Sequence, residues 1–174
     1  IMLMETALEK AKEIPNKDIQ LWTLSNLADM YGHANRFKDS YKLYLEVLKE
    51  DPHYYHALKG IAWLAFSKDN NPALSMRILK FLRKVHPAPD YDLLIAEIAD
   101  AQNDTVSKKQ LLQSFDKRVS NYLYGSMYNK YRFNLQAEEW KNPTEALKIA
   151  EAEVQLRPTG ETFSWLAWAY LINN

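Results

Sequence analysis

The chain has 174 residues, of which 47% are hydrophobic and 25% are charged, proportions typical of a folded domain that buries a core. Lysine and arginine together number 22, and so do aspartate and glutamate. The chain therefore lacks the basic excess that binding to nucleic acid or to an anionic membrane surface normally needs. It contains no cysteine, which excludes disulfides, thiolate nucleophiles and cysteine-ligated zinc.

Between the helix-breaking residues, apolar side chains recur at spacings of three and four, which predicts an all-α fold of ten helices in short-looped pairs. The first full pair is expected to begin with Asp18 as its N-cap, to turn at Asn35 and to end at Pro52. No low-complexity linker interrupts the pairs, so we expect a single array over residues 1–174. Its expected parts are the second helix of a preceding pair, four pairs and a last single helix, at 1–16, 18–53, 54–88, 90–119, 120–158 and 159–174.

The pair at 18–53 carries a recurring pattern of bulky, small and aromatic residues, at Leu24, Leu27, Ala28, Tyr31, Ser40, Tyr44 and Pro52. At every one of these positions it resembles the tetratricopeptide repeat family. The small residues allow two helices to approach closely, and the tyrosines fill the space around that contact. The resemblance implies a right-handed superhelix, or alpha-alpha solenoid, of stacked antiparallel helix pairs.

The same pattern returns along the chain with decreasing regularity. The second pair has Leu58, Ile61, Ala62, Ala65, Ser75, Leu79 and Pro87, and the third, weaker pair has Ile95, Ile98, Ala99, Leu111 and Phe115. In the fourth, Ala146, Ala150 and Pro158 come six residues late after Tyr124, Met127, Tyr128 and Tyr131, which we interpret as a lengthened first helix. The last helix returns to the pattern with Phe163, Leu166, Ala167 and Tyr170.

In the tetratricopeptide family, the first helix of each pair lines a concave groove. The resemblance therefore implies protein–protein interaction, with a peptide or helix of another protein bound by Trp22, Ser25, Asp29, His33, His56, Lys59, Trp63, Phe66, Ala96 and Asp100. Charge reversal at Asp29 or truncation of Trp63 is expected to weaken binding without unfolding the chain. The alternative interpretation is that Trp63 and Phe66 pack between repeats. Only Lys59 matches the lysine, asparagine and arginine clamp with which some family members hold a terminal carboxylate.

The last helix is apolar almost all round, which a helix tolerates only when it is covered on both sides. Either a following helix is missing from the sequence, or a second copy of the chain covers this one. The second possibility gives an alternative function, a structural spacer or assembly subunit that forms a homodimer through the C-terminal helix. Trp165, Trp168 and Leu171 would then make the contact, and Trp168→Glu would abolish self-association.

No pattern in the sequence predicts catalysis. There is no phosphate-binding glycine loop, no nucleophile–base–acid arrangement and no pair of acids beside a base, so we expect no enzyme and no cofactor. His53 and His56 lie one helical turn apart but lack a third ligand, so no metal site is expected. The basic residues Arg77, Lys80, Arg83 and Lys84 are interpreted as a solvated outer face, and the dense tyrosines Tyr122, Tyr124, Tyr128 and Tyr131 as mostly core. No apolar run reaches the ~20 residues that span a bilayer, so direct membrane insertion is not expected.

Overall fold

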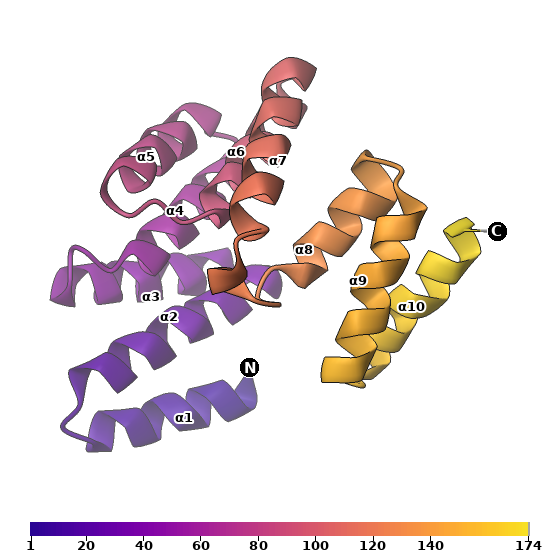
Figure 1. The fold of residues 1–174 in the computed structure, drawn as a ribbon. Coiled ribbons are helices and arrows are strands. Elements are labelled where there is room, and N and C mark those ends of the chain that lie inside the picture. Colours follow the sequence, from indigo (N-terminus) through magenta and orange to yellow (C-terminus); the bar gives the residue numbers. More distant parts are fainter. Residues whose placement is uncertain (174) are drawn as a thin grey trace. The chain divides into compact units, whose positions relative to one another are not determined.

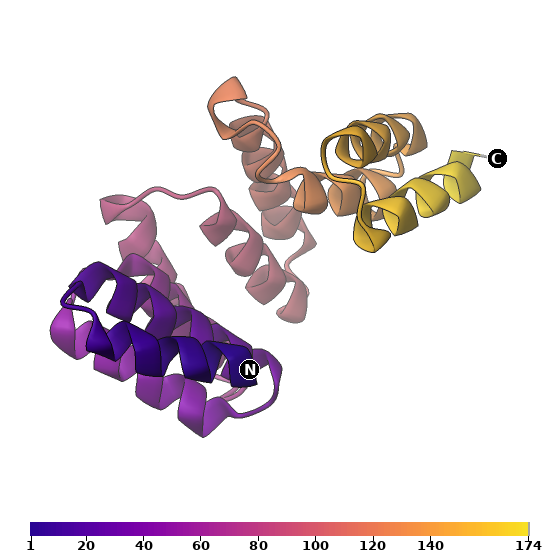
Figure 2. The same cartoon turned by 90° about the horizontal axis from the view of Figure 1, so that it is seen from below.

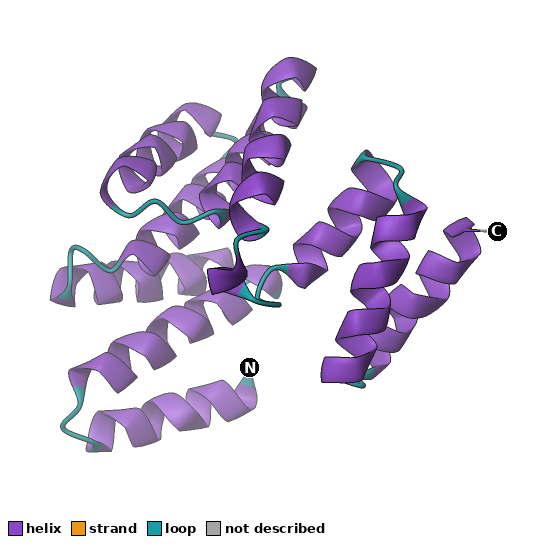
Figure 3. Cartoon of the chain, in the orientation of Figure 1, coloured by secondary structure: helices purple, strands orange, loops and turns teal. Residues whose placement is uncertain are grey.

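The computed structural model describes residues 1–173, which form helices and loops without any strand (Figure 3). The α-helices, labelled in Figure 1, are α1 (Met2–Glu13), α2 (Lys17–His33), α3 (Phe37–Glu50), α4 (Tyr55–Ser67), α5 (Pro72–Val85), α6 (Asp90–Ala101), α7 (Thr105–Val119), α8 (Asn129–Asn134), α9 (Pro143–Leu156) and α10 (Gly160–Asn173). A 3₁₀ turn, η1 (Tyr122–Tyr124), precedes α8, and a π-helix, η2 (Leu135–Glu139), follows it. The predicted all-α class is therefore confirmed.

The chain divides into two compact units, Ile1–Lys108 and the residues from Lys109 onward. In the first unit, α1 lies along α2 (Figure 2), α2 packs against α3, and α4 packs against α5. The first helices of successive pairs are also neighbours, because α4 contacts both α2 and α6. In the second unit, α9 packs against α10 on one side and against α8 and η2 on another.

Each turn inside a helix pair contains one residue with a left-handed backbone. Asn35, Asn70, Asn103 and Lys141 have φ angles of 61°, 48°, 60° and 50°. Asparagine adopts this conformation more readily than other residues with a β-carbon, because its short polar side chain can hydrogen-bond locally. In three of these turns, the side chain of the next residue accepts a hydrogen bond from a backbone N–H in the first turn of the following helix. These residues are Asn71, Asp104 and Asn142. The chain thus reverses and caps the new helix within two residues.

The helix ends are explained by proline and by capping. Asp51, His86 and Arg157 each precede a proline and have non-helical backbones, so α3, α5 and α9 end there. At the start of α2, the Asn16 side chain accepts a hydrogen bond from the Ile19 N–H at 3.1 Å. Asn16 is the N-cap, and the prediction of Asp18 was wrong; Asp18 lies in the first turn, where its charge is favourable to the helix dipole.

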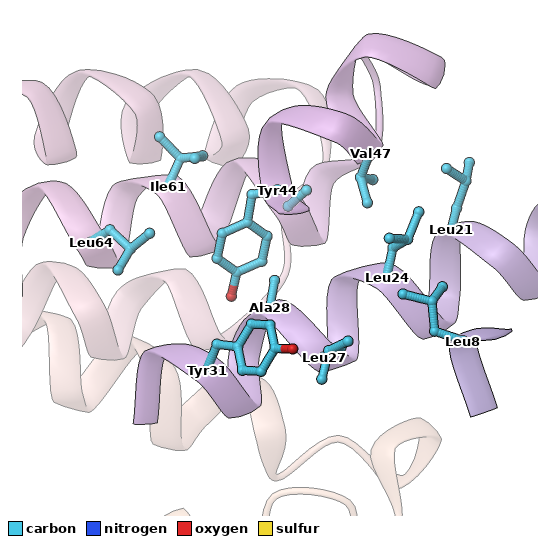
Figure 4. Close-up of a cluster of buried hydrophobic side chains, with 11 residues drawn as sticks. Leu8, Leu21, Leu24, Leu27, Ala28, Tyr31, Tyr44, Val47, Ile61 and Leu64 are labelled. Atoms are coloured by element: carbon cyan, nitrogen blue, oxygen red, sulfur yellow. The ribbon is translucent and has the colours of Figure 1, made fainter. Parts of the chain in front are cut away.

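The core of the first unit consists of buried side chains from α1, α2, α3 and α4 (Figure 4). Ala28 and Ser40 expose no surface, and Tyr44 exposes 1% of its own. Tyr44 fits beside α4 only because residue 60 is glycine: a β-carbon at Gly60 would lie 2.2 Å from the tyrosine ring. The small residues predicted from the sequence, Ala28 and Ser40, are therefore fully buried.

The first helix of the fourth pair is not lengthened, so that prediction was wrong. Gly125 has a φ of 51° and, with η1, interrupts the chain, so that α8 begins only at Asn129. Phe133 is fully buried in the core of the second unit. The spacing of Phe133, Ala146 and Pro158 in the sequence is the same as that of Leu27, Ser40 and Pro52 in the first full pair. The six extra residues belong to the connection before α8 rather than to the helix.

The tyrosines of this connection are only partly in the core. Tyr124 and Tyr128 are half-buried, and Tyr128 packs edge-on against the buried Phe115 at a ring distance of 5.7 Å. Tyr122 is 87% exposed and Tyr131 is 48% exposed. Helical spacing predicted that Tyr122 belongs to the core, but Tyr122 lies in the 3₁₀ turn η1, where that spacing does not apply.

Candidate functional site

The residues predicted to contact a partner lie on α2, α4 and α6, three neighbouring helices of the first unit. Several of these side chains bind to each other rather than standing free. His56 Nε2 on α4 lies 2.7 Å from Asp29 Oδ2 on α2, and the Tyr44 hydroxyl on α3 donates a hydrogen bond to Asp29 Oδ1. A single carboxylate therefore joins three helices.

The hydrogen bonds to Asp29 determine its electrostatics. Burial by itself would raise the pKa of Asp29, but the hydrogen bonds from His56 and Tyr44 outweigh this effect, and the net pKa lies below its usual value. Burial, together with the negative charge of Asp29, raises the pKa of the Tyr44 hydroxyl. The carboxylate is thus held ionised and the phenol neutral, which is the arrangement their hydrogen bond requires.

Two further contacts connect neighbouring helices on the same face. Lys59 Nζ on α4 lies 2.8 Å from Asp90 Oδ2 on α6, with both side chains largely covered. The His33 and Trp63 rings lie 5.4 Å apart, and Trp63 packs so closely on α2 that a β-carbon at Gly32 would approach it to 2.9 Å. Asp29, Lys59 and Trp63 therefore hold helices together, and charge reversal at Asp29 is expected to disturb folding as well as binding.

The remaining predicted residues differ widely in exposure. Ser25 is 1% exposed and its hydroxyl donates to the Trp22 carbonyl at 3.0 Å, while Ala96 is 2% exposed; neither is available to a partner. Phe66 is half-buried. Asp100 is exposed, with its carboxylate 3.3 Å from Lys108 Nζ.

Trp22 is the most prominent exposed side chain on this face, with 56% of its surface accessible. Together with Asp18, Ile19 and Tyr54 it lines an open, mainly apolar pocket of about 430 Å³. Of the residues that line this pocket, only Trp22 was predicted from the sequence as a binding residue. A signal was present, because Ile19 and Trp22 are apolar residues three apart that place two large side chains on the same side of α2.

The C-terminal helix presents only part of its predicted docking surface. Trp165 is 8% exposed and stacks on Phe133 with a ring distance of 5.5 Å, and Trp168 packs edge-on against the same ring. Trp165 therefore belongs to the core of the second unit and cannot serve as a docking residue. Leu171 is 75% exposed, and Phe163 and Tyr170 are about half exposed beside it on α10.

Within residues 1–173, no three metal-ligating side chains come together, and His56 is engaged by Asp29 rather than by His53. None of the helices in this part of the chain combines the length and apolarity needed to cross a bilayer. Searches of protein-family models, of curated proteins and of solved structures found no match to this chain.

Proposed function

We propose that the helix pairs are tetratricopeptide-like repeats of a right-handed solenoid that serves as a protein–protein interaction scaffold. In this proposal, an extended peptide or a helix of a partner protein lies across α2, α4 and α6. The role is one of binding rather than of catalysis.

Two observations support the repeat assignment. Positions that the pattern assigns to small residues are fully buried in both regular pairs, at Ala28, Ser40, Ala62 and Ser75. The left-handed turn residue recurs in every pair, including the one whose helices match the pattern least. Such internal recurrence is typical of repeat proteins, in which each pair contacts its sequence neighbours.

The observation that carries the binding proposal is the exposed Trp22 beside its pocket. A large aromatic side chain that stays 56% accessible, although the adjacent Leu21 and Thr23 are buried, supplies the contact area found at binding hot spots. The contacts from Asp29 to His56 and from Lys59 to Asp90 fix the surrounding helices, so little conformational freedom is lost when a partner binds.

The proposal is tested by selecting linear peptides from a phage-displayed library on the purified chain. Affinities of the selected peptides are then measured by fluorescence anisotropy for the wild type, for Trp22→Ala and for Tyr41→Ala. Trp22→Ala should weaken binding at least ~10-fold, as truncation of a hot-spot aromatic does. Tyr41, which is 43% exposed on α3, provides the matched control and should have no effect. Equal affinities for Trp22→Ala and the wild type would show that this face is not the binding site.

A second candidate is the structural subunit that docks through α10, which the exposure of Phe163, Tyr170 and Leu171 favours. Trp168→Glu is a poor test because Trp168 packs on the core residue Phe133. Leu171→Glu changes the exposed face alone. Sedimentation velocity over a wide concentration range should show a dimer that this variant dissociates; a monomer at all concentrations would reject this candidate and leave the groove proposal intact.

A further inference from the structure

Helix α5 carries a concentrated positive charge. It contains Arg77, Lys80, Arg83 and Lys84 and no acidic residue, within a chain whose positive and negative side chains are equal in number. Arg83 alone of these four has an ion-pair partner among residues 1–173, since its Nε lies 3.2 Å from the buried Asp92 carboxylate of α6. The other three cations are exposed to solvent.

Folding stability does not explain this arrangement. Arg77 and Lys80 are three residues apart and Lys80 and Lys84 are four apart, so each pair brings like charges together on the helix surface, which is destabilising. The helix dipole favours a cation at Lys84 in the last turn, but not at Arg77 or Lys80. In α1, by contrast, opposite charges lie three residues apart, in the pairs Lys10–Glu13 and Glu9–Lys12.

Two exposed apolar side chains lie beside the unpaired cations. Phe81 is 49% exposed and Val85 is 43% exposed. With 3.6 residues per turn, Arg77, Lys80, Phe81, Lys84 and Val85 occupy one side of α5, whereas Arg83 points toward Asp92. We call these five residues the cationic face. Phe81 and Val85 lie along one edge of this face, beside the three cations.

We propose that the cationic face binds an acidic amphipathic helix of a partner protein. Acidic residues at spacings of three and four would meet the three cations, and apolar residues along one side of the acidic row would cover Phe81. Nucleic acid fits less well, because three cations on one short surface neutralise few phosphates and the chain as a whole has no basic excess. This site lies on the second helix of its pair, so the inference does not depend on the face formed by α2, α4 and α6.

The test uses the whole chain and a fluorescein-labelled 18-residue helical peptide of glutamate, leucine and alanine, with glutamates spaced by three and four. Fluorescence anisotropy at low salt should show saturable binding. The triple variant Arg77→Glu/Lys80→Glu/Lys84→Glu should weaken binding at least ~10-fold, and Phe81→Ser by about threefold. If the triple variant fails to fold by circular dichroism, Lys80→Glu alone is used. That substitution replaces repulsive neighbours by attractive ones, so the helix is retained.

The matched control is Lys38→Glu/Lys42→Glu/Lys49→Glu, which reverses three exposed cations of α3 and changes the net charge equally. It should retain most of the affinity, and Trp22→Ala should retain all of it. The proposal is overturned if the two triple variants lose affinity equally, because the attraction is then long-range and not specific to α5. It is also overturned if a 20-nucleotide oligothymidine binds at α5 more tightly than the peptide, or if the peptide does not bind.

Discussion

At the scale of single residues, Asp29 shows that a polar residue on a proposed binding face can have a structural role. Its two carboxylate oxygens are used by His56 and Tyr44, which lie on two other helices. Tyr44 reaches Asp29 because Gly60 leaves space for the tyrosine ring. Removing one partner from such an arrangement leaves polar groups unsatisfied in partly buried surroundings, which costs more than the loss of an exposed contact.

We expect Asp29→Asn to be less stable than the wild type by about 1–2 kcal/mol at pH 7, since hydrogen bonds to a charged group are lost. The pKa of Asp29 is lowered on folding, so its ionised form stabilises the folded state at every pH above its unfolded pKa. That contribution is lost as the pH falls through the lower, folded value. The stability difference between variant and wild type, measured by urea unfolding, should therefore shrink as the pH is lowered below ~4.

Glu46→Gln is the appropriate control for this measurement. Glu46 is exposed on α3, and its side chain has neither an ion pair nor a hydrogen bond with any of residues 1–173. Its replacement should change stability little at any pH. A difference for Asp29→Asn that stays constant down to pH 2 would show that the charge of Asp29 does not stabilise the fold.

At the scale of secondary-structure elements, the left-handed residue in each hairpin turn decides where one helix gives way to the next. Three turns use asparagine, but the turn before α9 uses Lys141, which has no short side chain to offset the strain of a positive φ. Lys141→Asn should stabilise the second unit by about 0.5 kcal/mol, measured by thermal unfolding. The reverse exchange, Asn70→Lys, should lower the stability of the first unit by a similar amount. Unchanged stability in both variants would mean that these turns carry no strain.

The positions of most helices could be predicted from the sequence because proline and asparagine mark their ends. The fourth pair could not, since Tyr124, Tyr128 and Tyr131 have helical spacing and imitate the repeat pattern. The interruption depends on the positive φ of Gly125, and a single glycine in a periodic segment does not reveal its backbone angles. The spacing from Phe133 to Ala146 and Pro158 was present in the sequence, but the tyrosines were the more conspicuous match.

The candidate site was less predictable than the helices. The repeat pattern placed Trp22, Asp29 and His56 on the first helices of their pairs, and the structure has them there. The pattern could not show that Ser25 is buried or that Asp29 and His56 bind each other. Such contacts depend on side-chain rotamers and on the distance between helices that are far apart in the sequence.

At the scale of the whole molecule, the chain has two compact units with separate cores. We expect calorimetry to resolve two unfolding transitions, because each unit has a hydrophobic core of its own. Leu27→Ala, which opens a cavity in the first core, should destabilise by about 2–5 kcal/mol and shift one transition. Phe133→Ala should destabilise by about 3–5 kcal/mol and shift the other. A single transition that both variants shift equally would show that the units unfold together.

The hairpin turns also provide a reference for aligning the helix pairs with one another. The side chains that define the repeat pattern become irregular from the third pair onward, and a comparison based on them misplaces the fourth. A backbone torsion changes less readily than a side chain, since reversing it would redirect every residue that follows. Aligned on residues 35, 70 and 141, the first, second and fourth pairs agree in their second helices, because Ser40, Ser75 and Ala146 each follow the turn residue by five positions. The turn residue therefore marks the same point before the second helix in these three pairs.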